Sequence, residues 1–157
     1  MSTLANFSGH WTSSRQFGRF QDSIQNHGAA VESYKRAIKR GAWRRLRARL
    51  TGRSVQLQHY ATNGRLSGKR AAGVQIIALD RIIGSEGRSQ DFDNQFWPIT
   101  EHTRGRWVNI AIAMGTGKPL PPVQLIESAN GYVVRDGHHR ISVARAFGQE
   151  TIEAEVI

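Results

Sequence analysis

Between Ala29 and Leu50, apolar residues recur every three or four positions, and this period predicts a helix with one apolar stripe. The stripe consists of Val31, Tyr34, Ile38, Ala42, Leu46 and Leu50. Gly41 lies in the middle of the helix and weakens it by roughly 1 kcal/mol relative to alanine. The preceding residues, 1–27, are rich in Ser, Gln, Asn and Gly and show no period, so we expect them to be largely disordered.

The character of the sequence changes around residue 73. Residues 54–61 alternate between apolar and polar side chains and predict a short strand. The glycine-rich, basic residues 62–73 that follow predict a linker. We therefore expect three parts: a disordered N-terminus at 1–27, a basic helix, short strand and linker at 28–73, and a folded domain at 74–157.

The order of elements after this linker indicates the fold class. An apolar run at 74–83 predicts a strand that is interrupted by Asp80 and Arg81. The remaining pattern predicts, in order, a polar loop at 84–93, a helix at 101–114, strands at 123–127 and 132–134, a helix that begins at 139 and ends before Gly148, and a strand at 151–157. Strands and helices mixed in this order predict an α+β fold.

The turn between the strand at 132–134 and the next helix carries candidate chemistry. Gly137 precedes a helix N-terminus, where backbone N–H groups and the positive end of the helix dipole favour an anion. Arg140 adds a planar set of donors suited to phosphate, and His138 and His139 add further donors or proton carriers. The alternative is that Asp136 caps the helix and Arg140 pairs with an acid, with no ligand involved.

The sequence DGHHRISVARAFG, residues 136–148, resembles the signature of the ParB/sulfiredoxin superfamily, in which a strand and a glycine turn lead into a helix with a G-x-x-R or G-x-H-R motif. The resemblance covers roughly residues 74–157 and implies a small mixed sheet with flanking helices, here preceded by a basic helical segment. It also implies a bound nucleotide, with or without Mg²⁺. The residues that would hold its phosphates are Gly137, His138, His139, Arg140 and Arg88.

The polar loop at 84–93 is the second candidate region. Glu86 and Arg88 lie close to Asp91 and Asp93 in sequence, and acids beside a base suit a site better than a plain connection. The alternative is ordinary surface charge. In the superfamily that this segment resembles, kinase-like members use a carboxylate in this loop. The candidate catalytic residues are Glu86, Asp136 and His139.

The net charge of +10 is concentrated in the first half of the chain. Residues 1–75 contain 14 Lys and Arg but only two acids, whereas residues 76–157 contain 8 basic and 10 acidic residues. Such a basic segment predicts contacts with the phosphates of nucleic acid; the alternatives are a solvated basic face and an anionic membrane surface. The candidate contacts are Lys35, Arg36, Lys39, Arg40, Arg44, Arg45, Arg47, Arg49 and Arg53.

The composition also excludes several classes of function. The chain has no cysteine, so disulfides, thiolate metal sites and thiol chemistry are excluded, and a cytoplasmic location is expected. No apolar stretch approaches the ~20 residues that span a bilayer. Asp136, His138 and His139 are too close in sequence to converge readily on one metal ion, so we assign no metal ligand.

Three hypotheses follow from these patterns. The first is a ParB-like protein that binds a nucleotide at the turn 137–140 and nucleic acid through residues 35–53, as a nuclease or DNA-associated regulator. The second is a small phosphotransferase similar to the free-amino-acid kinases of the same superfamily, with Glu86 or Asp136 as general base. The third is a binding module without catalysis. The sequence leaves open whether the protein is an enzyme.

Overall fold

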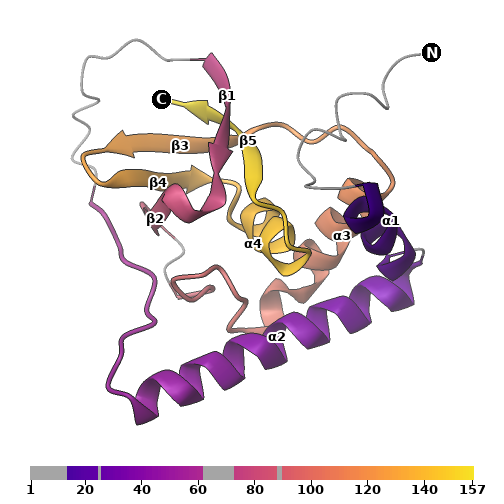
Figure 1. Cartoon of the computed structure of the whole chain (residues 1–157), viewed down its shortest axis with the longest axis horizontal. Coiled ribbons are helices and arrows are strands. Elements are labelled where there is room, and N and C mark those ends of the chain that lie inside the picture. The colour runs from indigo at the N-terminus through magenta and orange to yellow at the C-terminus, as the bar shows by residue number, and fades with distance from the viewer. Residues whose placement is uncertain (1–13, 25, 62–72, 88–89) are drawn as a thin grey trace.

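The computed structural model describes residues 14–24, 26–61, 73–87 and 90–157. A curved sheet lies over the helices, and the long helix α2 runs along one side of the molecule (Figure 1). This arrangement confirms the α+β class. The elements are α1 Ser14–Ser23, α2 His27–Leu50, β1 Gly73–Ala78, η2 Leu79–Arg81, β2 Ile82–Ser85, η3 Glu101–Thr103, α3 Arg104–Gly115, β3 Val123–Ser128, β4 Gly131–Asp136, α4 His138–Ala146 and β5 Thr151–Val156.

The five strands form one mixed sheet in the order β1-β5-β3-β4-β2. The pairs β1–β5 and β3–β4 are antiparallel, whereas β3–β5 and β2–β4 are parallel. The strands β1 and β2 occupy opposite edges, although only the short η2 separates them in sequence. Four residue steps reach at most about 14 Å, whereas five flat strands span about 19 Å. The sheet must therefore curl to bring its two edges together.

The break expected at Asp80 and Arg81 is thus confirmed. The two halves of the run 74–83 form separate strands at opposite edges of the sheet. The helix expected at 101–114 corresponds to η3 and α3, and it buries Trp107 and Met114. Thr100 precedes η3 and makes no side-chain cap hydrogen bond there.

The helix α4 lies in the centre of the fold, packed against α3 and β3. A helix was expected here, and all of its residues from His138 to Ala144 are buried. Ser142 Oγ accepts a hydrogen bond from Trp107 Nε1 at 2.9 Å, which satisfies a polar pair between α4 and α3. Gly148 has a φ of 76° and follows the end of the helix, as its place in the sequence predicted.

The helix α2 is confirmed, but its apolar stripe is only half correct. In the first half, Tyr34 is buried, packs edge-to-face on Trp107 at 5.5 Å, and donates to the Thr100 carbonyl at 2.8 Å. In the second half, Leu46 and Leu50 are 47% and 80% exposed, so the expected stripe does not face the core there. The buried positions of this half are instead Gly41 and Ala48.

Gly41 explains the shift of the buried face. A Cβ at Gly41 would lie 2.8 Å from the Cβ of Trp97, so glycine allows α2 to approach the loop at Trp97 closely. Small residues on the contact side, and not the larger leucines, therefore decide how the second half of the helix is oriented.

Within the segment that was expected to be largely disordered, Ser14–Ser23 form the helix α1, and Phe20 in this helix and Ile24 directly after it are buried. The ring of Phe20 lies edge-on to Phe147 with 4.4 Å between the centroids. Aromatic and apolar side chains without a period can still fold when another element offers them a surface. Residues 1–13 lie outside the described residues.

Residues 54–61 form an extended segment with isolated bridges and not the strand that alternation predicted. Gln56 bridges to Asp93, and His59 bridges to Ser85 at the end of β2. Leu57 is buried in the same core cluster as Tyr34 and Trp107. Most of the expected linker, residues 62–72, lies outside the described residues, and the domain boundary placed there stays a prediction.

Candidate functional site

The turn before α4 has the backbone geometry that glycine provides. Gly137 has a φ of 102°, in the left-handed region, and a Cβ there would lie 2.5 Å from Val123 Cγ1. Any larger residue would therefore disturb the packing of β3 as well as the turn itself. The glycine is required by the fold, and its presence does not by itself indicate a ligand.

Arg140 holds the same region together. Its Nη1 donates to the carbonyls of Pro121 and Pro122, the latter at 3.0 Å, and its Nη2 donates to Asp136 Oδ2 at 2.7 Å. Burial lowers the pKa of the Arg140 guanidinium, and the carboxylate of Asp136 opposes this effect. These contacts match the alternative in which Arg140 pairs with an acid. Much of its donor capacity is thus committed to the chain itself.

The two histidines point into the protein and not toward solvent. His138 is buried, and its Nε2 lies 2.6 Å from the Oγ of the buried Ser85. His139 is also buried, and its ring lies edge-on to Phe92 with 5.1 Å between the centroids. The contact between Ser85 and His138 ties the end of β2 to the start of α4. Sequence reasoning missed Ser85, whose only signal was its position at the start of the polar loop expected at 84–93.

Glu86 lies at the same end of the sheet as the turn. Its carboxylate accepts from Arg135 Nε at 2.7 Å and from Arg135 Nη2 at 3.3 Å. This bond lowers the pKa of Glu86 and raises that of Arg135. A carboxylate held ionised by a bidentate arginine is a weak general base at neutral pH. Arg135 was not expected to have a role, and Arg88 lies outside the described residues.

The structure thus brings Glu86, Asp136 and Gly137 together at the ends of β2 and β4. Their polar groups are largely engaged with Arg135 and Arg140. Asp136 is the most accessible of the three, because its side chain is 62% exposed. Among the described residues, no group of three or more His, Asp or Glu side chains is arranged to hold a metal ion.

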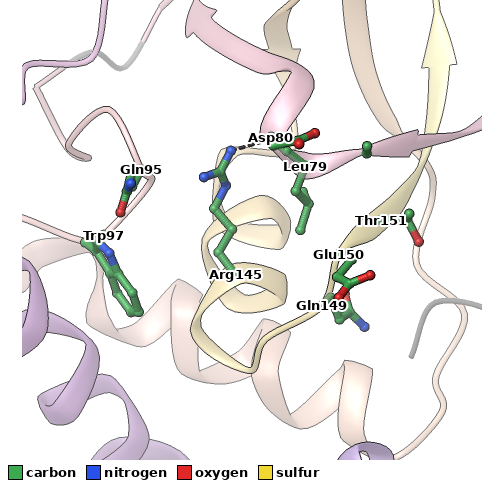
Figure 2. A pocket seen from close by; sticks show the side chains of 9 residues that line it. Leu79, Asp80, Gln95, Trp97, Arg145, Gln149, Glu150 and Thr151 are labelled. Atoms are coloured by element: carbon green, nitrogen blue, oxygen red, sulfur yellow. Dashed lines mark hydrogen bonds between the residues drawn. The ribbon is translucent and has the colours of Figure 1, made fainter. Parts of the chain in front are cut away.

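A pocket of about 490 Å³ with a mixed polar and apolar lining lies at the other end of α4 (Figure 2). Arg145 extends from α4 toward the short helix η2, where its Nη2 donates to the Leu79 carbonyl. Burial lowers the pKa of Arg145, while Asp80 and Asp93 act in the opposite direction. Asp80 and Glu150 also line the pocket. One arginine facing two acids gives no clear preference for an anionic ligand.

The nine basic candidates on and after α2 fall into two groups. Arg44 and Arg45 are partly buried and lie 3.2 Å and 3.8 Å from Oδ2 of the buried Asp93. Asp93 also accepts from the backbone N–H groups of Gln95 and Trp97, so this carboxylate organises the loop against which α2 packs. The exposed group consists of Lys35, Arg36, Lys39, Arg40, Arg47, Arg49 and Arg53.

Two pockets follow one flank of α2. The first, which we call the Trp43 pocket, has a volume of about 500 Å³. Its lining residues are Arg40, Trp43, Arg44, Arg47, Ala48, Thr51, Arg53, Ser54 and Val55. The second, which we call the Phe147 pocket, has a volume of about 380 Å³. Its lining residues are Ser33, Arg36, Ala37, Lys39, Arg40, Trp97, Ala146 and Phe147.

Trp43 is the second residue that sequence reasoning missed. It is 67% exposed and lies between Arg40 and Arg47 on the helix. It could have been recognised in the sequence as an aromatic residue that lies inside the basic run but outside the apolar stripe. None of the described residues that line the two pockets is acidic, so this flank presents several cations around Trp43. Among the lining arginines, Arg44 has a counter-charge in Asp93, behind the pocket.

No described helix is both long and apolar enough to cross a membrane. Comparison with models of known protein families gives no match, and a search of curated proteins also finds none. The resemblance to the ParB/sulfiredoxin superfamily stays a prediction, and the site is interpreted from its own residues.

Proposed function

We propose that this protein binds nucleic acid through the flank of α2 that carries the Trp43 and Phe147 pockets. The observation that supports the proposal is the excess of positive charge on that flank. Five exposed basic residues line the two pockets, namely Arg36, Lys39, Arg40, Arg47 and Arg53, and no acid lines either pocket among the described residues. A surface of this kind costs electrostatic self-repulsion in the free protein, and a polyanion removes that cost.

The only acid within α2 does little to offset the charge. Glu32 pairs with Lys35 at 2.7 Å, and both side chains are more than half exposed. They lie on the first turns of the helix, away from Arg40 and Arg47. The second half of the helix is therefore open to an external anion.

The shape of the flank favours a nucleic acid over an anionic membrane. A basic helix that lies on a bilayer inserts a continuous apolar face into the lipid. Here the exposed large apolar residues of the second half of α2, Trp43, Leu46 and Leu50, share one side of the helix, but they extend over only about two turns and have Arg47 and Arg49 on either side. The neighbouring surface is hollowed into pockets. Hollows lined by arginine suit phosphates and bases better than a flat lipid surface.

The test compares two pairs of charges on the same helix. Arg36→Ala with Arg47→Ala removes two cations that line the pockets, and Lys35→Ala with Arg49→Ala removes two exposed cations that line neither. Fluorescence anisotropy is measured with labelled DNA and RNA over a series of salt concentrations. We expect the first pair to reduce the slope of log K against log salt by about 1.4–1.8, and the control pair to change it much less.

Two results would contradict the proposal. Absence of binding by the unmodified protein at low salt would remove nucleic acid as the partner. Equal losses in both pairs would show a diffuse charge effect that involves no particular flank. The nucleotide site at the turn 137–140, and the nuclease or phosphotransferase activity that depends on it, are separate predictions whose outcome this experiment leaves unchanged.

A further inference from the structure

We propose that the flank of α2 selects single-stranded nucleic acid, with one unpaired base stacked on Trp43 and the adjoining phosphates held by Arg36, Arg40 and Arg47. This inference rests on the proposed function and adds the class of nucleic acid to it. The inference starts from the exposed indole of Trp43, because the positive charge of the surface gives no reason for an exposed aromatic side chain.

Trp43 offers an accessible aromatic face at the centre of the basic flank. Its side chain is 67% exposed, although tryptophan is buried on average in folded proteins. An unpaired base can stack on such a ring, whereas a base inside a duplex has both faces covered by its neighbours. A solvent-exposed indole among arginines therefore adds affinity for a single strand that a duplex cannot use.

The Trp43 pocket places cations on both sides of the ring. Arg40 and Arg47 lie seven positions apart with Trp43 between them, which separates their Cα atoms by about 10 Å along the helix axis. Arg53 lines the same pocket from the turn that follows the helix. A base in this pocket would thus have arginines within reach of the phosphates before and after it.

The two pockets form one track because Arg40 lines both. The helical positions in their linings run from Ser33 to Thr51 and include a line of residues three or four apart, at positions 33, 36, 40, 44, 47 and 51, which is the spacing of a single flank. The length of this flank is about 27 Å. The axial rise of 3.4 Å per nucleotide in duplex DNA sets an upper limit of about eight nucleotides along it, and a more extended single strand would place fewer.

The walls of the track are fixed before any ligand binds. Arg44, which lines the Trp43 pocket, donates to Asp93 at 3.2 Å and to Asn94 at 2.8 Å. The guanidinium of Arg40 lies over the ring of Trp97, 5.9 Å from its centroid. A preformed track lowers the entropy that must be lost on binding.

A second copy of the chain is a poorer occupant of the same flank. Two copies packed through Trp43 would bring Arg40 and Arg47 of one copy close to the same arginines of the other. No described residue that lines the pockets is acidic, so this repulsion would be unopposed. A single strand, in contrast, brings one negative charge per nucleotide.

The experiment compares a labelled 12-nucleotide oligo(dT) with a labelled 12-base-pair duplex in anisotropy titrations. We expect the unmodified protein to bind the single strand more tightly. Trp43→Ala should lower the affinity for the single strand by about ten- to a hundredfold, and Trp43→Phe by much less. Affinity for the duplex should change by less than about twofold.

Leu50→Ala is the matched control, because Leu50 is an exposed apolar residue of the same helix that lines neither pocket. It should leave both affinities unchanged. Quenching of tryptophan fluorescence by oligo(dT) should be strong in the unmodified protein and weak in Trp43→Phe. That readout reports contact at the ring and would not follow from a general loss of stability.

The outcomes separate this inference from the proposed function. Binding to neither probe overturns both. Equal affinity for the two probes, or an equal effect of Trp43→Ala on both, overturns the single-strand inference and leaves nucleic-acid binding intact. Binding of vesicles that contain phosphatidylserine, lost in Trp43→Ala while oligo(dT) binding is unchanged, would assign Trp43 to a membrane surface and also overturn it.

Discussion

Arg44 donates from Nη1 to Oδ2 of the buried Asp93 at 3.2 Å, and this bond anchors the basic helix to the rest of the fold. Its second terminal nitrogen donates to Asn94 Oδ1 at 2.8 Å. Asp93 in turn fixes the loop by accepting from the N–H groups of Gln95 and Trp97. One arginine of the basic run therefore has a structural role.

We expect Arg44→Ala to destabilise the protein. The change leaves the buried Asp93 with a longer ion pair to Arg45, at 3.8 Å, and with the more distant Arg145. Loss of a charged hydrogen-bond partner from a buried group costs about 1.5–3 kcal/mol, and the free energy of unfolding from urea denaturation should fall by this amount. Arg49→Ala removes the same charge from an exposed position and should change stability by less than about 0.5 kcal/mol.

The structural role of Arg44 and Arg45 limits which substitutions can be used to test binding. Reversing Arg44 or Arg45 to Glu would place a second negative charge beside the buried Asp93, so a loss of nucleic-acid binding could come from misfolding. A deficit in unfolding free energy that is equal for Arg44→Ala and Arg49→Ala would show that the bond to Asp93 contributes nothing beyond general charge.

The second prediction concerns the expected domain boundary. Tyr34 and Leu57 lie before it but belong to the same core cluster as Trp107. A fragment of residues 73–157 would expose Trp107 and leave the Thr103 hydroxyl without Tyr34, its partner at 3.1 Å. We therefore expect this fragment to lack a cooperative thermal transition and the near-ultraviolet circular dichroism of the full chain. A cooperative transition with a native near-ultraviolet spectrum would confirm the boundary that the sequence predicted.

The sequence could predict elements whose signal is local. The period of α2 follows from residues within a few turns of each other, so its existence and length were recognised. Its orientation was not, because Leu46 and Leu50 would suit a core contact equally well. The orientation of α2 depends on Gly41 and its close approach to Trp97, which lies more than fifty positions away in the sequence.

The same distinction applies to the candidate site. A glycine turn followed by an arginine has the same local pattern whether the arginine meets a phosphate or a carbonyl. In this protein, Arg140 Nη1 donates to the carbonyls of Pro121 and Pro122. These contacts cannot be recognised from the sequence near residue 140. Trp43 was overlooked for the opposite reason, because its role depends on which side of α2 stays exposed.

The third prediction tests the turn as a nucleotide site. Arg140→Ala should lower the free energy of unfolding by about 1.5–3 kcal/mol, since it removes charge-assisted bonds to Asp136 and the Pro122 carbonyl. Asp136→Asn keeps the shape of an exposed side chain and weakens its hold on Arg140. If the turn binds phosphate, calorimetry with ATP, CTP and GTP should show tighter binding to Asp136→Asn than to the unmodified protein.

Two other outcomes of that titration would lead to a different interpretation. Weaker binding to Asp136→Asn would indicate that the carboxylate contacts the ligand directly. No heat from the unmodified protein at millimolar nucleotide would leave Gly137 and Arg140 as structural residues alone. Gly137→Val is unsuitable as a binding variant, because its side chain would clash with Val123 and disturb the fold.

The last prediction concerns pH and the pair formed by Glu86 and Arg135. The hydrogen bond from Arg135 lowers the pKa of Glu86 below its ordinary value of 4.5. A carboxyl whose pKa is lower in the folded protein stabilises it above the unfolded pKa, and the contribution disappears as the pH falls through the folded pKa. The pair is partly exposed, so its contribution should be about 0.5 kcal/mol near neutral pH.

We expect Glu86→Gln to lower the free energy of unfolding by this amount above pH 5 and to match the unmodified protein at more acidic pH, as measured by urea denaturation across a pH series. A difference that is constant from pH 7 to below pH 3 would show that the amide perturbs packing and that the ion pair has no part in the effect.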